Sequence, residues 1–136
     1  MASINGSCLC GTVRYTINEP IASMGHCHCK MCQHYHGTAY STYAMVTRSA
    51  VEFTSGEQSL AVYHSSNPVE RAFCRACGSP ISYTHADSKD NIWLTAGSLD
   101  TEPDCLPQYH IFVADKVAWL EISDDLPQYP GFPPNH

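Results

Sequence analysis

Apolar and polar residues alternate along much of this chain, which is the pattern of half-buried β-strands. The clearest run is Thr12–Ile17, where every second side chain is apolar or aromatic. Similar runs are found at Ala39–Val46, Leu60–Tyr63, Pro80–Thr84, Ile92–Ser98 and Val117–Ile122. Turn-forming residues separate these runs, for example at Ser55–Glu57 and Asp87–Asn91.

Helical periodicity is weak throughout the chain. No window of a dozen residues keeps apolar side chains at positions i, i+3, i+4 and i+7. We expect short helical turns only around Cys29–Tyr35 or near Asp100–Asp104. The pattern therefore predicts an all-β fold with little helix.

The length of 136 residues fits a single domain, which we place at residues 1–125. Four prolines follow position 126, at 127, 130, 133 and 134. We therefore expect residues 126–136 to form a proline-rich C-terminal strap, with Tyr129 and Phe132 as its anchors.

The charge balance excludes several classes of partner. Seven Lys and Arg against thirteen Asp and Glu give a net charge of −6, which does not suit nucleic acid. The sequence shows neither the apolar run of a membrane span nor the basic and apolar regions of a secretory signal. We expect a cytoplasmic protein with reduced thiols, bound to neither nucleic acid nor membrane.

Seven of the eight cysteines fall into three short motifs. Cys8–Gly11 is a C-x-C followed by glycine, Cys27–Cys32 is a C-x-C-x-x-C triplet, and Cys74–Gly78 is a C-x-x-C followed by glycine. These gaps let thiolates turn toward one ion, and the glycine permits the turn that closes the loop. In a reduced protein such motifs indicate metal binding.

The seven cysteines divide into four and three. A structural zinc has four protein ligands, whereas a catalytic zinc has three and an open position. The triplet can form an open site alone, while the other two motifs must pair to form a closed site that stabilises a modest core. The expected ligands are Cys27, Cys29 and Cys32 for the open site, and Cys8, Cys10, Cys74 and Cys77 for the closed one. Thiolates favour zinc, with an iron–sulfur cluster as the less favoured alternative.

A second pairing stays open, because proximity in space and not in sequence decides ligation. In it, one ion is held by Cys8, Cys10, Cys27 and Cys29, and the other by Cys32, Cys74 and Cys77. The eighth cysteine, Cys105, stands apart from the motifs, and we expect a free thiol there.

Polar residues around the triplet offer further chemistry. Any of its neighbouring histidines is a candidate fourth ligand or proton shuttle, although a supporting or surface role is the expectation for each one. These histidines are His26, His28, His34 and His36. Lys30 and Arg75 lie inside cysteine loops, where positive charge offsets clustered thiolates.

At these motifs the chain resembles the glutathione-dependent formaldehyde-activating (GFA) family, the CENP-V/GFA domain. The similarity runs from Gly6–Gly11 through Cys27–Cys32 and Phe73–Gly78 to Ile92–Leu99, His110 and Trp119. It implies an all-β zinc fold of the β-tent type over residues 1–125. It also implies one structural zinc on the closed site and, on the triplet, a second zinc where a thiol substrate acts.

The resemblance implies a reaction as well, in which formaldehyde and glutathione join into S-(hydroxymethyl)glutathione, a carbon–sulfur lyase reaction in reverse. We therefore predict a zinc-dependent lyase for thiol adducts of small aldehydes, with a thiol such as glutathione and a small aldehyde as partners. One alternative is a non-catalytic thiol-binding or carrier protein. The other is a structural zinc interaction module, which the lack of a basic stripe disfavours. No sequence feature indicates the oligomeric state.

Overall fold

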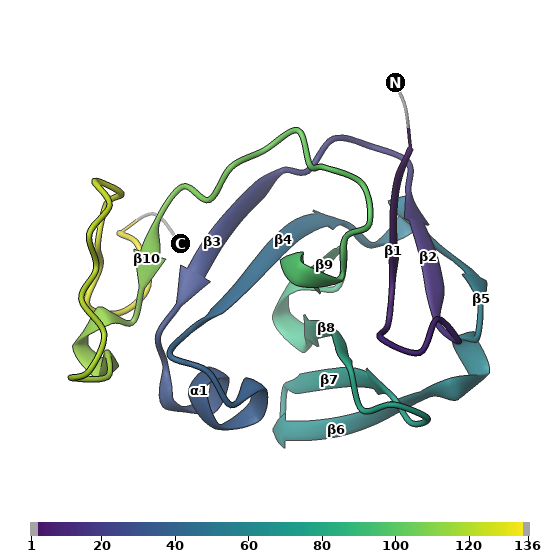
Figure 1. The fold of residues 1–136 in the computed structure, drawn as a ribbon, viewed down its shortest axis with the longest axis horizontal. Helices are drawn as coiled ribbons and strands as arrows, with labels where there is room; N and C mark the ends of the chain where they lie inside the picture. The colour runs from purple at the N-terminus through teal and green to yellow at the C-terminus, as the bar shows by residue number, and fades with distance from the viewer. Residues whose placement is uncertain (1–2, 135–136) are drawn as a thin grey trace.

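The computed structural model describes residues 3–134. Two β-sheets make up the fold (Figure 1). The small sheet contains, in spatial order, β1 (Ile4–Ser7), β2 (Arg14–Ile17) and β5 (Val51–Ser55). The large sheet contains, in spatial order, β10 (His110–Ile111), β3 (Ser23–Cys27), β4 (Ser41–Thr47), β9 (Asn91–Thr95), β8 (Pro80–His85), β7 (Val69–Cys74) and β6 (Leu60–Ser66).

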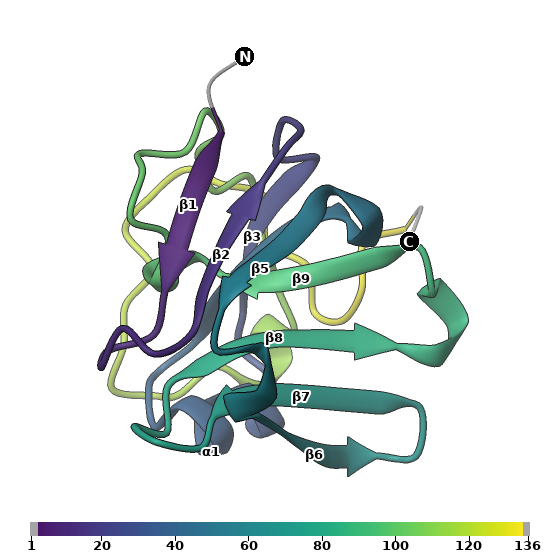
Figure 2. The same ribbon diagram turned by 90° about the vertical axis from the view of Figure 1, so that its right-hand side faces the viewer.

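Neighbouring strands run antiparallel except for β10 and β3, which pair in parallel. Figure 1 shows the large sheet curling from β3 over β4 and β9 toward β7 and β6. The small sheet stands beside it, and the turned view in Figure 2 shows β1, β2 and β5 next to β8 and β9. The all-β prediction is therefore confirmed.

Helical structure is short in the described residues. The one α-helix there is α1 (Lys30–His36), where the sequence predicted a helical turn. The remaining helical segments are 3-10 turns at Arg48–Ala50, Glu57–Ser59, Ala86–Ser88, Ala96–Ser98 and Val113–Asp115. The turn expected near Asp100–Asp104 was wrong, because the backbone N–H groups of Asp100 and Thr101 both donate to the Asn5 carbonyl. This segment therefore lies against β1 and does not form a helical turn.

One predicted strand was also wrong. The run Val117–Ile122 alternates in sequence but forms no strand. The Lys116 ammonium donates to the carbonyls of Val117 and Leu120. These carbonyls therefore accept hydrogen bonds from a side chain and not from the backbone of a neighbouring strand. Trp119 lies 75% exposed within this segment, so the apolar positions of the run are not buried against the core.

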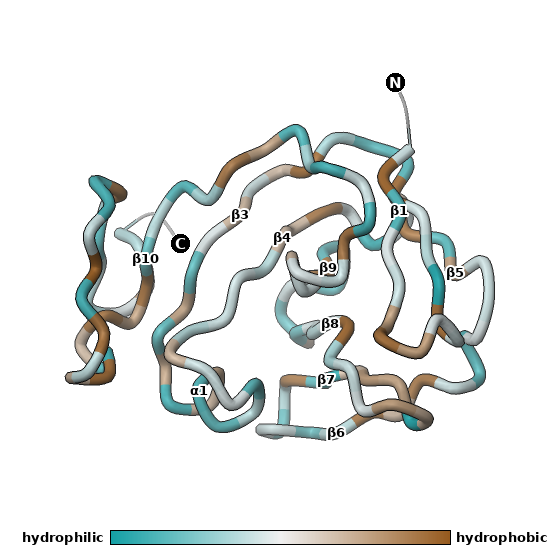
Figure 3. Tube along the Cα trace, in the orientation of Figure 1, coloured by the Kyte–Doolittle hydropathy of each residue, from teal (hydrophilic) through white to brown (hydrophobic). Residues whose placement is uncertain are grey.

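The main core lies between the two sheets. Its fully buried side chains include Tyr15 and Ile17 of β2, Ile81 of β8 and Leu94 of β9. Cys8 and Cys74 belong to the same apolar cluster. Hydrophobic and hydrophilic residues change places at short intervals along the coloured trace (Figure 3). None of the described helices is long and apolar enough to cross a membrane.

The C-terminal segment runs along the outer edge of β10. His110 and Gln128 form a parallel bridge, and the Tyr129 N–H donates to the His110 carbonyl over 2.9 Å. The rings of Phe112 and Phe132 meet edge to face with centroids 4.8 Å apart. These contacts cover a sheet edge that would otherwise present unpaired backbone groups. Residues 135–136 of the predicted strap lie outside the described residues.

The turn after β5 gives a prediction about stability. Gly56 has φ = 73°, and a Cβ there would lie 2.0 Å from the Thr12 carbonyl oxygen. We expect Gly56→Ala to lower the free energy of unfolding by roughly 2–4 kcal/mol, through backbone strain and this clash. The matched control is Gly97→Ala, where a Cβ meets nothing within 4 Å. Urea unfolding of the metal-loaded protein measures both, and equal midpoints would contradict the prediction.

Candidate metal centres

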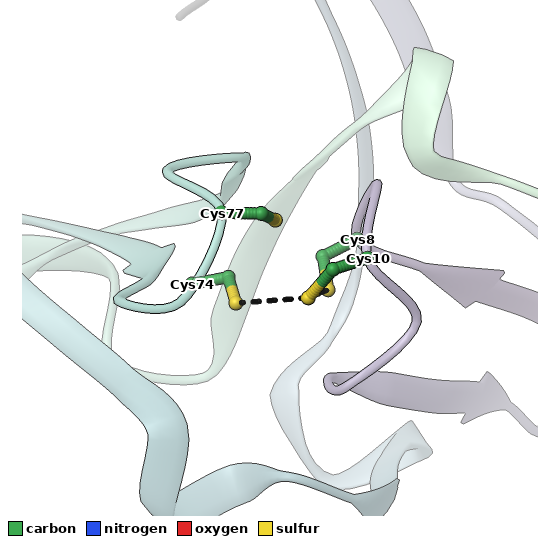
Figure 4. A group of neighbouring side chains, drawn as sticks. All are labelled: Cys8, Cys10, Cys74 and Cys77. Atoms are coloured by element: carbon green, nitrogen blue, oxygen red, sulfur yellow. Dashed lines mark hydrogen bonds between the residues drawn. The ribbon is translucent and has the colours of Figure 1, made fainter.

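Four cysteines meet where the small sheet approaches the large one (Figure 4). Cys8 and Cys10 come from the turn between β1 and β2, while Cys74 ends β7 and Cys77 lies in the turn that follows it. Their sulfurs lie within 4.8 Å of one another. Gly11 and Gly78 close the two turns with φ of 80° and 83°, as the sequence predicted.

The spacing of these sulfurs fits a tetrahedral thiolate site. Thiolates at the usual zinc–sulfur distance of ~2.3 Å lie roughly 3.8 Å apart around a tetrahedral ion. The Sγ atoms of Cys8 and Cys10 are 3.6 Å apart, and those of Cys10 and Cys74 are 3.9 Å apart. All eight cysteines are free thiols in this structure. The donor set therefore matches a metal centre.

Hydrogen bonds reach two sulfurs of this centre, while burial raises the pKa of Cys74 to about 11. The Val13 N–H donates to Cys8 Sγ over 3.3 Å. The Ser79 hydroxyl, 3.1 Å from Cys77 Sγ, is the largest of the causes that lower the pKa of Cys77 to about 5. Hydrogen bonds to sulfur stabilise the charged form, which is the form that binds metal.

The triplet forms a second group at the start of α1. Cys27 ends β3, Cys29 is the N-cap of α1, and Cys32 lies in its first turn. Their sulfurs also lie within 4.8 Å of one another. The Cys32 N–H donates to Cys29 Sγ over 3.4 Å, as an N-cap requires. The structure thus brings the seven cysteines together in the four-plus-three grouping, and not in the alternative pairing.

None of the four candidate histidines joins the triplet's ligand group in the described structure. His34 is exposed, and His26 Nδ1 lies 2.7 Å from the Thr42 hydroxyl. His36 Nε2 lies 2.6 Å from the Tyr43 hydroxyl. Burial lowers the pKa of His36 to about 4 and raises that of Tyr43, so the Tyr43 hydroxyl donates to a neutral imidazole.

His28 takes part in a buried chain of hydrogen bonds that the sequence did not reveal. Its Nε2 lies 2.8 Å from His110 Nδ1, and His110 Nε2 lies 3.0 Å from an Asp124 carboxylate oxygen. Both rings are almost fully buried. Because a carboxylate only accepts, His110 Nε2 donates to it, and a neutral His110 then accepts at Nδ1 from His28 Nε2–H. The C-terminal segment therefore contacts the triplet loop through two imidazoles.

A cleft of about 650 Å³ lies between the two cysteine groups. It extends from Cys8 and Leu9 to His36 and Ser41, and Ser41 is the register partner of Cys27. Most of its remaining lining is hydroxyl-bearing, and Asp100 is its one carboxylate. The Ser7 hydroxyl donates to Asp100 over 2.6 Å. The cleft is thus rich in hydroxyl groups and reaches the surroundings of both groups.

The other residues singled out from the sequence belong to neither thiol group. The Lys30 ammonium donates to the Gln33 side chain over 3.4 Å, and Arg75 is exposed. Cys105 lies outside both groups and packs against the core. Sequence reasoning missed Arg71, a buried cation whose central carbon lies 5.2 Å from the ring centroid of Tyr35 in α1.

The similarity of this chain to known proteins spans all three cysteine motifs. A family model described as glutathione-dependent formaldehyde-activating enzyme matches residues 3–115. An uncharacterized lyase of Schizosaccharomyces pombe is 27% identical over 136 residues, covering 86% of this chain and 96% of that protein. A Penicillium rubens protein, provisionally named a glutathione-dependent formaldehyde-activating enzyme, is 26% identical over 125 residues. That match covers 92% of this chain and 56% of the Penicillium protein.

The fold has a counterpart among solved structures. A crystal structure of a Rhodobacter sphaeroides protein superposes with a TM-score of 0.61 at 20% sequence identity. The match covers 74% of this chain and 91% of that one. At this identity the likeness concerns the fold alone.

The two cysteine groups predict different effects of substitution. Cys74 is fully buried in the core, so Cys74→Ser removes a ligand of the closed site and disrupts packing. We expect it to lower the melting temperature by ~10 °C or more, or to prevent folding. Cys29→Ser keeps a good N-cap residue and should lose one metal ion with the fold intact. Metal counting and thermal melts test this, and equal damage from both variants would contradict it.

The histidine chain predicts a switch of tautomer. Asp124 Oδ1 also accepts from the Leu126 N–H over 3.0 Å. In Asp124→Asn the remaining oxygen keeps that bond, so the new NH2 takes the Oδ2 position, which is nearer to His110 Nε2 (3.0 Å against 3.2 Å for Oδ1) and favours an accepting Nε2. We expect His110 and His28 to exchange their protonated nitrogens, visible in side-chain ¹⁵N shifts of the metal-loaded protein. The exposed Asp125→Asn is the charge-matched control, and unchanged tautomers in Asp124→Asn would refute the chain.

Proposed function

The chain belongs to the glutathione-dependent formaldehyde-activating (GFA) family, and from this membership we propose that it is a zinc-dependent carbon–sulfur lyase. The observation that carries the proposal is a group of three thiols beside a hydroxyl-lined cleft, with no fourth protein ligand among residues 3–134. Three protein ligands and an open position are typical of catalytic zinc, and four are typical of structural zinc.

The proposed substrates are thiol adducts of small aldehydes. In the synthetic direction a thiol sulfur attacks the carbonyl carbon, a carbon–sulfur bond forms, and the thiol proton ends on the carbonyl oxygen. Glutathione and formaldehyde are the first pair to consider, since both occur in the family's name. Cleavage of S-(hydroxymethyl)glutathione is the reverse reaction.

We assign one zinc ion to each cysteine group. The closed site, on Cys8, Cys10, Cys74 and Cys77, is structural in this proposal, and the triplet of Cys27, Cys29 and Cys32 holds the second ion. When bound there, zinc supplies a Lewis-acidic position at which a thiol is held as the more nucleophilic thiolate.

The protein's own side chains bind and orient the adduct. The closed site fixes the loop of Cys8 and Leu9, and that loop is one wall of the cleft. At the other end His36 and Ser41 line the cleft next to the triplet. The Tyr43 hydroxyl hydrogen-bonds His36 and holds its ring in one orientation. Hydroxyl side chains between these ends can donate to and accept from the polar groups of an adduct.

A thiol carrier that uses the same site is the second candidate. It is favoured by one observation, that His36, the imidazole lining the cleft, already accepts from Tyr43 and is not free to take a proton from substrate.

We also propose that residues 1–125 form the zinc domain and 126–136 a strap, and that the protein acts in the cytoplasm, where free thiols such as these persist.

Magnetisation-exchange NMR on formaldehyde and glutathione tests the lyase proposal. We expect the zinc-loaded protein to accelerate exchange between the free thiol and its adduct, and Cys29→Ser to return the rate to the uncatalysed value. Cys105→Ser is the matched control, because it removes a thiol outside both metal groups and should leave the rate unchanged.

An uncatalysed rate with both zinc ions present would exclude this reaction for glutathione and formaldehyde. Selective broadening of the glutathione signals in the same sample would then identify a thiol carrier. Acceleration that survives in Cys29→Ser would exclude the triplet as the site.

A further inference from the structure

Arg71 is a buried cation without a carboxylate partner. It lies in β7 and is only 5% exposed. Buried charges in proteins are ordinarily paired, because moving a charge out of water costs more free energy than contacts with neutral groups recover. Across residues 3–134 the ion pairs join His85 to Asp87 and His110 to Asp124, and Arg71 takes part in neither. Its compensating negative charge must come from another source.

Neutral groups hold the guanidinium in place. Its Nε donates to the Ser65 hydroxyl over 2.9 Å, and Nη1 donates to the Tyr43 hydroxyl over 3.3 Å. The ring centroids of Tyr35 and Tyr83 lie 5.2 and 5.6 Å from its central carbon. Burial raises the pKa of Tyr43 and of Tyr83, so neither phenol supplies an anion at neutral pH.

The residues that hold Arg71 also adjoin the triplet. Tyr35 lies in α1, three residues after Cys32. Tyr43 lies in β4, two residues after Ser41 and therefore on the same face, and Ser41 pairs in register with Cys27. Arg71 thus projects from β7 toward the corner where α1 and the end of β3 gather the thiols.

Charge balance then identifies the partner. A divalent ion on three thiolates carries a net charge of −1, and one guanidinium brings the assembly to zero. We propose that Arg71 is the counter-charge of the triplet's metal ion and a positioning residue for that site. The proposal rests on the proposed function only in assigning a divalent ion to the triplet. The closed site differs, because the arginine in its loop, Arg75, is exposed to water.

Competition with a chromophoric chelator for zinc tests the proposal on the two-zinc protein. We expect Arg71→Gln to release one ion at chelator concentrations about 10–100-fold lower than the unaltered protein requires, the range found for residues that support metal ligands. The ion of the closed site should be retained as before. Arg48→Gln removes the same charge from an exposed side chain at the end of β4 and should change neither ion.

Arg71→Lys separates charge from hydrogen bonding. It keeps the cation but loses the forked donor pair that reaches Ser65 and Tyr43. A counter-charge role predicts that Lys retains the second ion better than Gln, even where Gln destabilises the fold. Equal loss in the Lys and Gln variants, or unchanged affinity in Arg71→Gln, would overturn the proposal. Since no substrate is present, absence of lyase activity would leave this result standing.

Discussion

The meeting of two cysteine turns is the contact on which the rest of the structure depends. One turn belongs to the small sheet and the other to the large sheet, and Cys8 and Cys74 are part of the apolar cluster between them. A modest core thus shares its packing with four sulfur atoms. Because the same turn places Leu9 in the cleft wall, the shape of the cleft depends on this contact as well.

The two cysteine groups and several strands could be predicted from sequence, because each depends on residues that are close together in the chain. Cysteine spacing and the glycines after Cys10 and Cys77 identified both groups, since ligands two or three residues apart must turn together. Alternation found β2, which has one buried face, and also β4, which has buried side chains on both faces. It misled at Val117–Ile122, where nothing in the sequence announces that the Lys116 side chain satisfies the carbonyls.

What the sequence did not reveal depends on contacts between distant residues. Strand β10 has two residues and no periodicity to detect, yet it brings His110 next to His28, 82 residues away. Arg71 lies in β7, a strand that the alternation pattern did not predict, and its burial follows from the curl of the large sheet that carries β7 toward α1. Such features arise from register and curvature, which short-range patterns do not encode.

The two cysteine groups differ in how much chain they span, and this has a consequence for biosynthesis. All three thiols of the triplet are contained in Cys27–Cys32, so they leave the ribosome together. The closed group spans Cys8–Cys77 and is complete only 45 residues after Cys32, about 2–9 s later at typical translation rates. During that interval the nascent chain offers a metal ion the three neighbouring thiols of the triplet, together with Cys8 and Cys10 of the still incomplete closed group. The order of synthesis thus makes the triplet's thiols available to a metal ion before the sheets can close on each other.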